Sequence, residues 1–174
     1  MLGAGQQKIL RANAGSTKTN GWTHFVALGI DVGRTDMSFF AALINSSVFT
    51  GAVDNPSTLL NTIGICKDLA DTNYFFMYNN AAGSATKVDT GIGVVASIQH
   101  LLTLNIACDA LGNITMQFSD IDANLTKVIT IPTATAKLPG PNLPLWGQNV
   151  INTGSITGTV VTMAFFKYVQ VGAF

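Results

Sequence analysis

Apolar and polar residues alternate along most of this chain, and a period of two is typical of strands rather than helices. The pattern predicts strands at residues 22–31, 48–53, 59–67, 74–78, 87–95, 125–131 and 158–171. Residues 37–44 are almost continuously apolar, so periodicity does not distinguish a buried strand from a short helix there.

The clearest local pattern is a hairpin formed by residues 101–109 and 113–119, joined through the turn Asp109-Ala110-Leu111-Gly112-Asn113. Side chains alternate between the two faces of a strand, so one face of this hairpin is predicted to lie in the core. The predicted core residues are Leu102, Leu104, Ile106, Cys108, Ile114, Met116 and Phe118.

Short strands separated by frequent turns predict an all-β fold, an antiparallel β-sandwich or jelly roll. The length of 174 residues suits one domain. We predict a polar, glycine-rich N-terminal arm at residues 1–21 and a single jelly-roll domain at residues 22–174. Residues 132–144 hold four of the five prolines, which indicates an ordered loop leading to Leu145, Trp146 and Gly147.

Charge is scarce, and this limits the classes of partner. Charged residues make up 10% of the chain, with 9 basic and 9 acidic residues, whereas roughly 25% is usual. Without a basic run, nucleic acid is not an expected partner. A neutral surface rich in threonine and asparagine is poorly protected against self-association. We therefore expect much of it to contact copies of this chain or other subunits.

No apolar stretch is long enough for a membrane-spanning helix, and the N-terminus lacks the apolar segment of a signal peptide. Membrane contact and export by that route are therefore not expected. Cys66 and Cys108 match no metal or redox spacing, and both lie in apolar strand patterns. We expect free core thiols rather than a disulfide.

Candidate catalytic and metal-binding groups are few. His24 and His100 are the only histidines, and the sequence has no G-x-S-x-G motif to supply a nucleophile. Asp120 and Asp122, with Asn124 nearby, could offer oxygen ligands to Ca²⁺. The alternative, which we favour, is a solvated turn, and the same choice applies to Asp68 and Asp71. We predict no catalytic residue, no metal site and no cofactor.

The two tryptophans have two interpretations. Trp22 and Trp146 could stack on a sugar ring, or they could anchor a contact between subunits, where aromatic residues are common. We favour an interface formed by Trp22, Trp146 and the prolines Pro139 and Pro141 of the preceding loop.

The order of several short motifs resembles the concanavalin A-like jelly rolls of tailed-phage virion proteins. An aromatic strand at residues 75–78 precedes D-T-G-I-G-V at 89–94 and the hairpin around D-A-L-G-N. The phrases I-P-T at 131–133, P-G-P at 139–141 and F-F-K-Y at 165–168 follow. The chain departs from the pattern at Gln99-His100, where a Trp-Tyr pair is usual, and at residues 120–122, where an N-G turn is usual. The first 47 residues match nothing in it.

The resemblance implies a virion placement without catalysis. We expect a structural protein made in the host cytoplasm and carried on the particle exterior, as a capsid decoration or head-associated protein. Its partners would be copies of itself, the major capsid protein, or fibre and tail components. The alternative is a lectin-like receptor-binding tail or fibre protein that recognises host glycans. A glycan hydrolase would need a placed pair of carboxylates that the sequence does not show.

Overall fold

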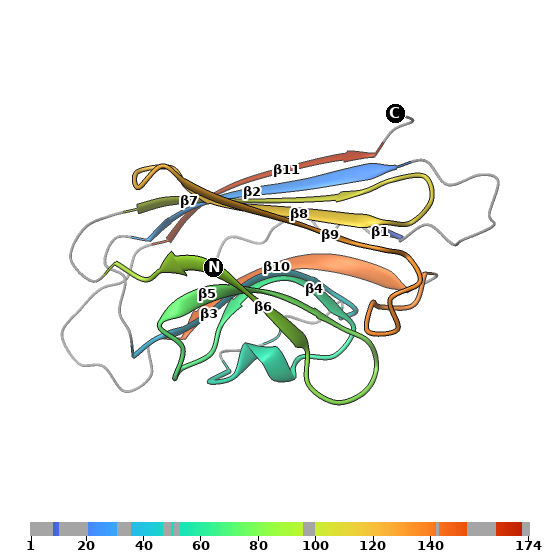
Figure 1. The fold of residues 1–174 in the computed structure, drawn as a ribbon, viewed down its shortest axis with the longest axis horizontal. Helices are drawn as coiled ribbons and strands as arrows, with labels where there is room; N and C mark the ends of the chain where they lie inside the picture. The colour runs from blue at the N-terminus through green and yellow to red at the C-terminus, as the bar shows by residue number, and fades with distance from the viewer. Residues whose placement is uncertain are drawn as a thin grey trace.

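The protein folds as two antiparallel sheets that face each other (Figure 1). This computed structural model describes residues 9–10, 21–30, 36–46, 50, 53–95, 100–141, 143–152 and 163–171. The six-stranded sheet has the order β1 (Ile9–Leu10), β10 (Pro144–Asn152), β3 (Ser38–Ile44), β4 (Thr62–Lys67), β5 (Asn73–Asn79), β6 (Thr86–Gly93). The five-stranded sheet has the order β11 (Met163–Val171), β2 (Trp22–Ile30), β7 (His100–Cys108), β8 (Ile114–Asp120), β9 (Leu125–Ile131). The predicted all-β sandwich is confirmed.

The main hydrophobic core lies between the sheets and takes alternate side chains from the strands of both. The β7–β8 hairpin forms where it was predicted, with Cys108 opposite Ile114 and Leu102 opposite Asp120. Its seven predicted core residues are all at most 2% exposed and belong to this core. The predicted register is therefore confirmed.

A second, smaller cluster covers the other face of the six-stranded sheet. It contains Phe40, Ala42, Ile44, Cys66, Met77 and Val150. The alternate residues of β3, such as Phe39 and Leu43, belong to the main core, so β3 is buried on both faces. This double burial explains why its sequence is apolar from Phe39 to Ile44, and it resolves the choice between strand and helix in favour of a strand.

The D-T-G phrase of the sequence is a bulge in β6. Asn73 lies opposite Gly93 whereas Phe75 lies opposite Asp89, so the register shifts between them. Gly91 has φ +70°, a conformation that favours glycine. The Thr90 hydroxyl donates to the Tyr74 carbonyl at 2.6 Å and fixes the bulge to β5.

Several predictions need correction or fall outside the described residues. The strand predicted at residues 59–67 begins later than expected. A 3-10 helix occupies Pro56–Thr58, and β4 begins only at Thr62. Pro144, the last residue of the predicted proline-rich loop, is already the first residue of β10. The sequence pattern did not predict that strand. Residues 47–49, 51–52 and 153–162 lie outside the description, as does most of the predicted arm. Of the arm, Ile9–Leu10 pairs with β10 at the edge of the sheet.

Both cysteines are free and buried, as predicted, and burial raises the pKa of the Cys66 thiol. Among the described residues, no helix is both long and apolar enough to cross a membrane.

Two isoleucines provide a matched test of the packing. Ile106 is fully buried in the main core, whereas Ile121 in the β8–β9 turn is 51% exposed. Replacing Ile106 by alanine should lower the free energy of unfolding by about 2–5 kcal/mol, because it leaves a cavity. The same change at Ile121 should cost under about 0.5 kcal/mol. Urea unfolding measures both, and equal losses would show that the described register is wrong.

Candidate functional site

His100 and Asp120 form a buried pair at one end of the β7–β8 hairpin. Nδ1 of His100 lies 2.5 Å from Oδ2 of Asp120, whose side chain is 2% exposed. The other carboxylate oxygen of Asp120 accepts a hydrogen bond from the Ala123 amide at 2.9 Å. The prediction of a solvated turn is therefore wrong for Asp120, because the strand pairing brings His100 against it. The second ring nitrogen of His100 is buried without a hydrogen-bond partner, so a substrate could not reach it as a general base.

Asp122 completes a group that could hold a metal ion. One donor atom from each of His100, Asp120 and Asp122 lies within 4.8 Å of the others. A nitrogen with two carboxylates suits a transition metal better than Ca²⁺, which takes six to eight oxygens. Asp122 also accepts a hydrogen bond from the Leu101 amide at 2.6 Å. Hydrogen bonds within the chain therefore already account for the placement of these three side chains.

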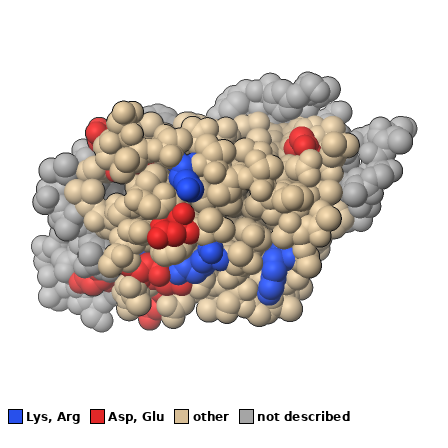
Figure 2. Space-filling view, in the orientation of Figure 1, with Lys and Arg blue, Asp and Glu red and all other residues tan. Residues whose placement is uncertain are grey.

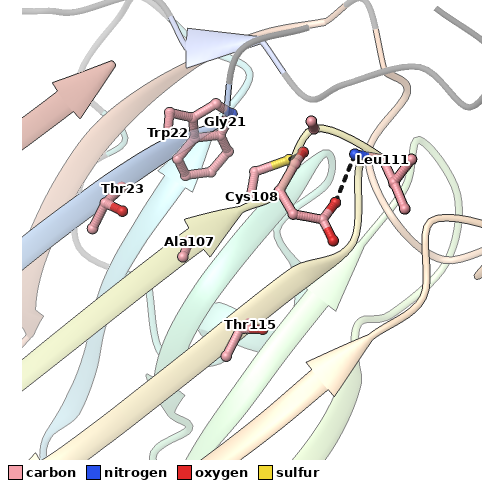
Figure 3. Close-up of a pocket in the computed structure, with 9 residues that line it drawn as sticks. Gly21, Trp22, Thr23, Ala107, Cys108, Leu111 and Thr115 are labelled. Carbon is pink, nitrogen blue, oxygen red and sulfur yellow. Dashed lines mark hydrogen bonds between the residues drawn. The ribbon is translucent and has the colours of Figure 1, made fainter. Parts of the chain in front are cut away.

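A pocket of about 510 Å³ lies at the opposite end of the hairpin (Figure 3). Its walls come from β2, β7, β8 and the hairpin turn, and the lining residues are Gly21, Trp22, Thr23, Ala107, Cys108, Asp109, Ala110, Leu111 and Thr115. The lining is mostly apolar, and Thr23 and Thr115 are among its polar residues. Such a wall suits a small ligand with an apolar face and a few hydroxyl groups.

Asp109 is the only carboxylate of this pocket, and the turn itself uses it. Its side chain accepts hydrogen bonds from the amides of Leu111 and Asn113 and from the Asn113 side chain, at 2.8–2.9 Å. Burial alone would raise the pKa of the Asp109 carboxyl, but the hydrogen bonds from Asn113 outweigh it and hold the pKa below its ordinary value. The carboxylate thus fixes the hairpin turn, in which Gly112 takes φ +84°.

A network of charged side chains holds the 3-10 helix to the six-stranded sheet. Lys87 forms ion pairs with Asp71 and, at 2.9 Å, with Asp68, and its ammonium lies 4.3 Å from the centre of the Phe75 ring. Asp68 also accepts hydrogen bonds from the Ser57 amide and hydroxyl, at 2.9 and 2.6 Å. Asp68 and Asp71 therefore have partners within the fold. Neither of the two alternatives considered from the sequence, a solvated turn or a Ca²⁺ site, accounts for their placement.

The four predicted interface residues differ in how much surface they offer. Trp22 is 2% exposed and belongs to the main core, and Pro139 is also buried. Both pack within the chain, which leaves them little area for a partner. Trp146 lies opposite Ile44 in β10 and is partly exposed, as is Pro141. Of the four residues, only Trp146 and Pro141 have exposed surface with which to contact a partner. That they form such a contact stays a prediction.

Comparison with known proteins identifies the fold but no family. No protein-family model and no curated protein matches the sequence. Arcelin-5, a lectin-like defence protein from Phaseolus vulgaris, matches with a TM-score of 0.55 and 10% identity, over 94% of this chain and 74% of its own. An endo-β-1,4-glucuronan lyase from the fungus Trichoderma reesei matches with a TM-score of 0.50 and 14% identity, over 98% and 76%.

A third match is the CBM2 module of the evolved Dit of Lactobacillus casei BL23 phage J-1, at a TM-score of 0.46 and 10% identity, over 97% of this chain and 70% of that one. That score is too low to add to the argument. The first two matches show that the chain has the concanavalin A-like lectin and glucanase type of β-sandwich. This fold is shared by a lectin-like protein and a lyase, so the fold does not decide the function.

The ion-pair network predicts a dependence of stability on pH. Burial alone would raise the pKa of the Asp68 carboxyl, but hydrogen bonds from Ser57 and Lys87 outweigh it and lower the pKa. A lowered folded pKa means that the carboxylate stabilises the fold above its unfolded pKa of about 4 and loses this effect as the pH falls through the folded value. Asp68→Asn should cost about 1–3 kcal/mol at pH 7 and progressively less below about pH 4.

Asp54→Asn is the matched control, because Asp54 is exposed and its side chain accepts a hydrogen bond from Asn152. It should change stability by under about 0.5 kcal/mol. Urea unfolding of both variants from pH 2 to pH 7 is the measurement. A loss for Asp68→Asn that stays constant across this range would contradict the assigned role of its charge.

Proposed function

We propose that this chain is a non-catalytic structural protein on the exterior of a tailed-phage virion, a capsid decoration or head-associated protein made in the host cytoplasm. The observation that carries the proposal is the scarcity of charge on a surface that exposes large apolar side chains. Figure 2 shows one face with few charged side chains. The exposed apolar residues include Leu60, Leu69, Leu101, Leu111, Ile121, Leu125 and Val128. Such a surface is suited to being covered by neighbouring subunits.

The sequence motifs support the same proposal. The order of the aromatic strand, the D-T-G phrase and the D-x-x-G-N hairpin is the order that resembles the phage jelly rolls. In the structure these motifs are β5, the bulge of β6 and the turn between β7 and β8. They build the sandwich itself, in keeping with a structural role.

The placement of the carboxylates supports a role without catalysis. All nine acidic residues of the chain are aspartates. Seven of them accept hydrogen bonds from other groups of the chain: Asp54, Asp68, Asp71, Asp89, Asp109, Asp120 and Asp122. A glycoside hydrolase needs two carboxylates aimed at one bond. The seven named aspartates instead accept hydrogen bonds that hold parts of this fold together.

Trp146 provides the test of the virion role, because it is the partly exposed aromatic residue among the predicted contacts. Trp146→Ala should weaken incorporation into particles of the encoding phage. An aromatic hot spot contributes about 2 kcal/mol or more, which corresponds to about thirty-fold in affinity. Trp146→Phe is the matched control and should retain most of the occupancy. Copies per purified particle are counted by quantitative mass spectrometry, with thermal melts to verify folding. Absence of the wild-type chain from particles would refute the virion role.

A second candidate function, recognition of host glycans, is favoured by the pocket beside Trp22. The pocket combines an apolar wall with two polar residues, Thr23 and Thr115. Glycan-array binding that is lost in Thr115→Val and retained in Thr103→Val would support it, because Thr103 lies on β7 outside this lining. An array without any bound glycan would remove this candidate and leave the structural role untouched.

A further inference from the structure

We propose that strand β9 is a docking edge for a second copy of this chain, and that two copies pair β9 to β9 in antiparallel fashion. The two five-stranded sheets would then form one continuous sheet across a twofold axis. This inference rests on the strand edge itself and does not depend on the proposed virion role.

Strand β9 lies at the edge of the five-stranded sheet, and among the described strands it pairs only with β8. An edge strand presents a row of backbone amides and carbonyls that have no partner in their own sheet. The side chains from Leu125 to Val128 are all exposed, so no other segment covers them. Figure 1 shows β9 along the open side of the sandwich, in front of β8.

The other edge strand whose side chains the structure describes, β6, carries more devices against pairing than β9 does. Strand β6 carries the bulge opposite Asn73, a glycine at φ +70°, and the charged side chains of Lys87 and Asp89. Bulges and charges are devices that prevent edge-to-edge contact. Strand β9 pairs with β8 in unbroken register and contains no proline. Its one such device is Lys127, which lies on the core-facing side opposite Phe118 and is exposed.

The sequence of β9, L-T-K-V-I-T-I, is complementary to itself when Val128 lies on the twofold axis. Val128 then lies beside Val128 of the second copy, on the outer face of the sheet. Thr126 lies opposite Thr130 of that copy, and these hydroxyl groups could pair as Thr115 and Thr130 do within the sheet, at 3.3 Å. Cross-strand pairs of this kind stabilise sheets.

The same register avoids a direct opposition of the only charge of the strand. Lys127 lies opposite Ile129 of the second copy, so the two lysines are not directly opposed. Val128 is 50% exposed and Leu125 is 46% exposed in the single chain, and pairing removes apolar surface of both from water. The net charge of zero adds no long-range repulsion between identical copies. These features favour a second copy over a charged peptide.

Charge substitutions on the axis provide the first test. The wild-type chain should sediment at twice its mass of 18.3 kDa, whereas Val128→Lys and Val128→Glu should each sediment as monomers. Each substitution places two like charges side by side. An equal mixture of the two variants should recover a dimer, because the charges then attract. Leu111→Lys, at a 69% exposed position on the hairpin turn, should remain a dimer.

A cysteine substitution provides the second test and is read on the folded chain. Val128→Cys should form a reducible covalent dimer under mild oxidation, because the two thiols meet at the axis. Gln117→Cys is the matched control, since Gln117 is exposed on the same face but lies one strand inward, opposite Val128. It should not cross-link to itself. The native Cys66 and Cys108 are buried and should not contribute.

Three outcomes would overturn the proposal. The wild-type chain could be monomeric at every concentration tested, or it could remain dimeric after Val128→Lys, which would place the contact at another surface. Alternatively, Gln117→Cys could cross-link as readily as Val128→Cys, which would indicate random collision. Thermal melts close to that of the wild type establish that each variant is folded, so a monomer is not mistaken for an unfolded chain.

Discussion

The burial of every second side chain of the β7–β8 hairpin between two sheets is the constraint on which the rest of the structure depends. The hairpin lies inside the five-stranded sheet, so it sets the positions of β2 on one side and β9 on the other. A slip of one residue would bring Thr103 and Asn105 into the core in place of Leu104 and Ile106. The Asp109 carboxylate and Gly112 fix the turn, so local chemistry and core packing specify the same register.

The sequence predicted the strands that bury one face, because their alternation is visible in the residues. It did not decide β3, since both faces of that strand are buried and no polar residue interrupts the apolar run from Phe39 to Ile44. It missed β10 for a different reason. Gly147, Gln148 and Asn149 interrupt the apolar pattern, and the Gln148 side chain bonds to the Thr50 amide and the Ser46 carbonyl. Those partners lie about a hundred positions away and are set by the tertiary fold alone.

The fate of the acidic residues shows the same limit. Asp120 and Asp122 look like exposed turn residues in the sequence, but strand register brings Asp120 against His100, twenty positions earlier. In a chain with so few charges, almost every carboxylate within the described residues is engaged by a nearby amide, hydroxyl or lysine. The surface is consequently left to threonine, asparagine and apolar side chains. A metal ion or a catalytic pair would have to compete with hydrogen bonds that already hold turns and helices in place.

The two candidate contact surfaces belong to different sheets, and this separation matters for assembly. Strand β9 closes one edge of the five-stranded sheet, whereas Trp146 belongs to β10, near the β1 edge of the six-stranded sheet. The partner of Trp146 in the register is Ile44, a member of the cluster on the outer face of that sheet. A copy paired through β9 would therefore leave Trp146 uncovered by that pairing. Two copies joined at β9 would present two Trp146 side chains related by a twofold axis. A paired unit could then bind a symmetric or repeating partner at two points, and the gain in avidity would offset a weak individual contact.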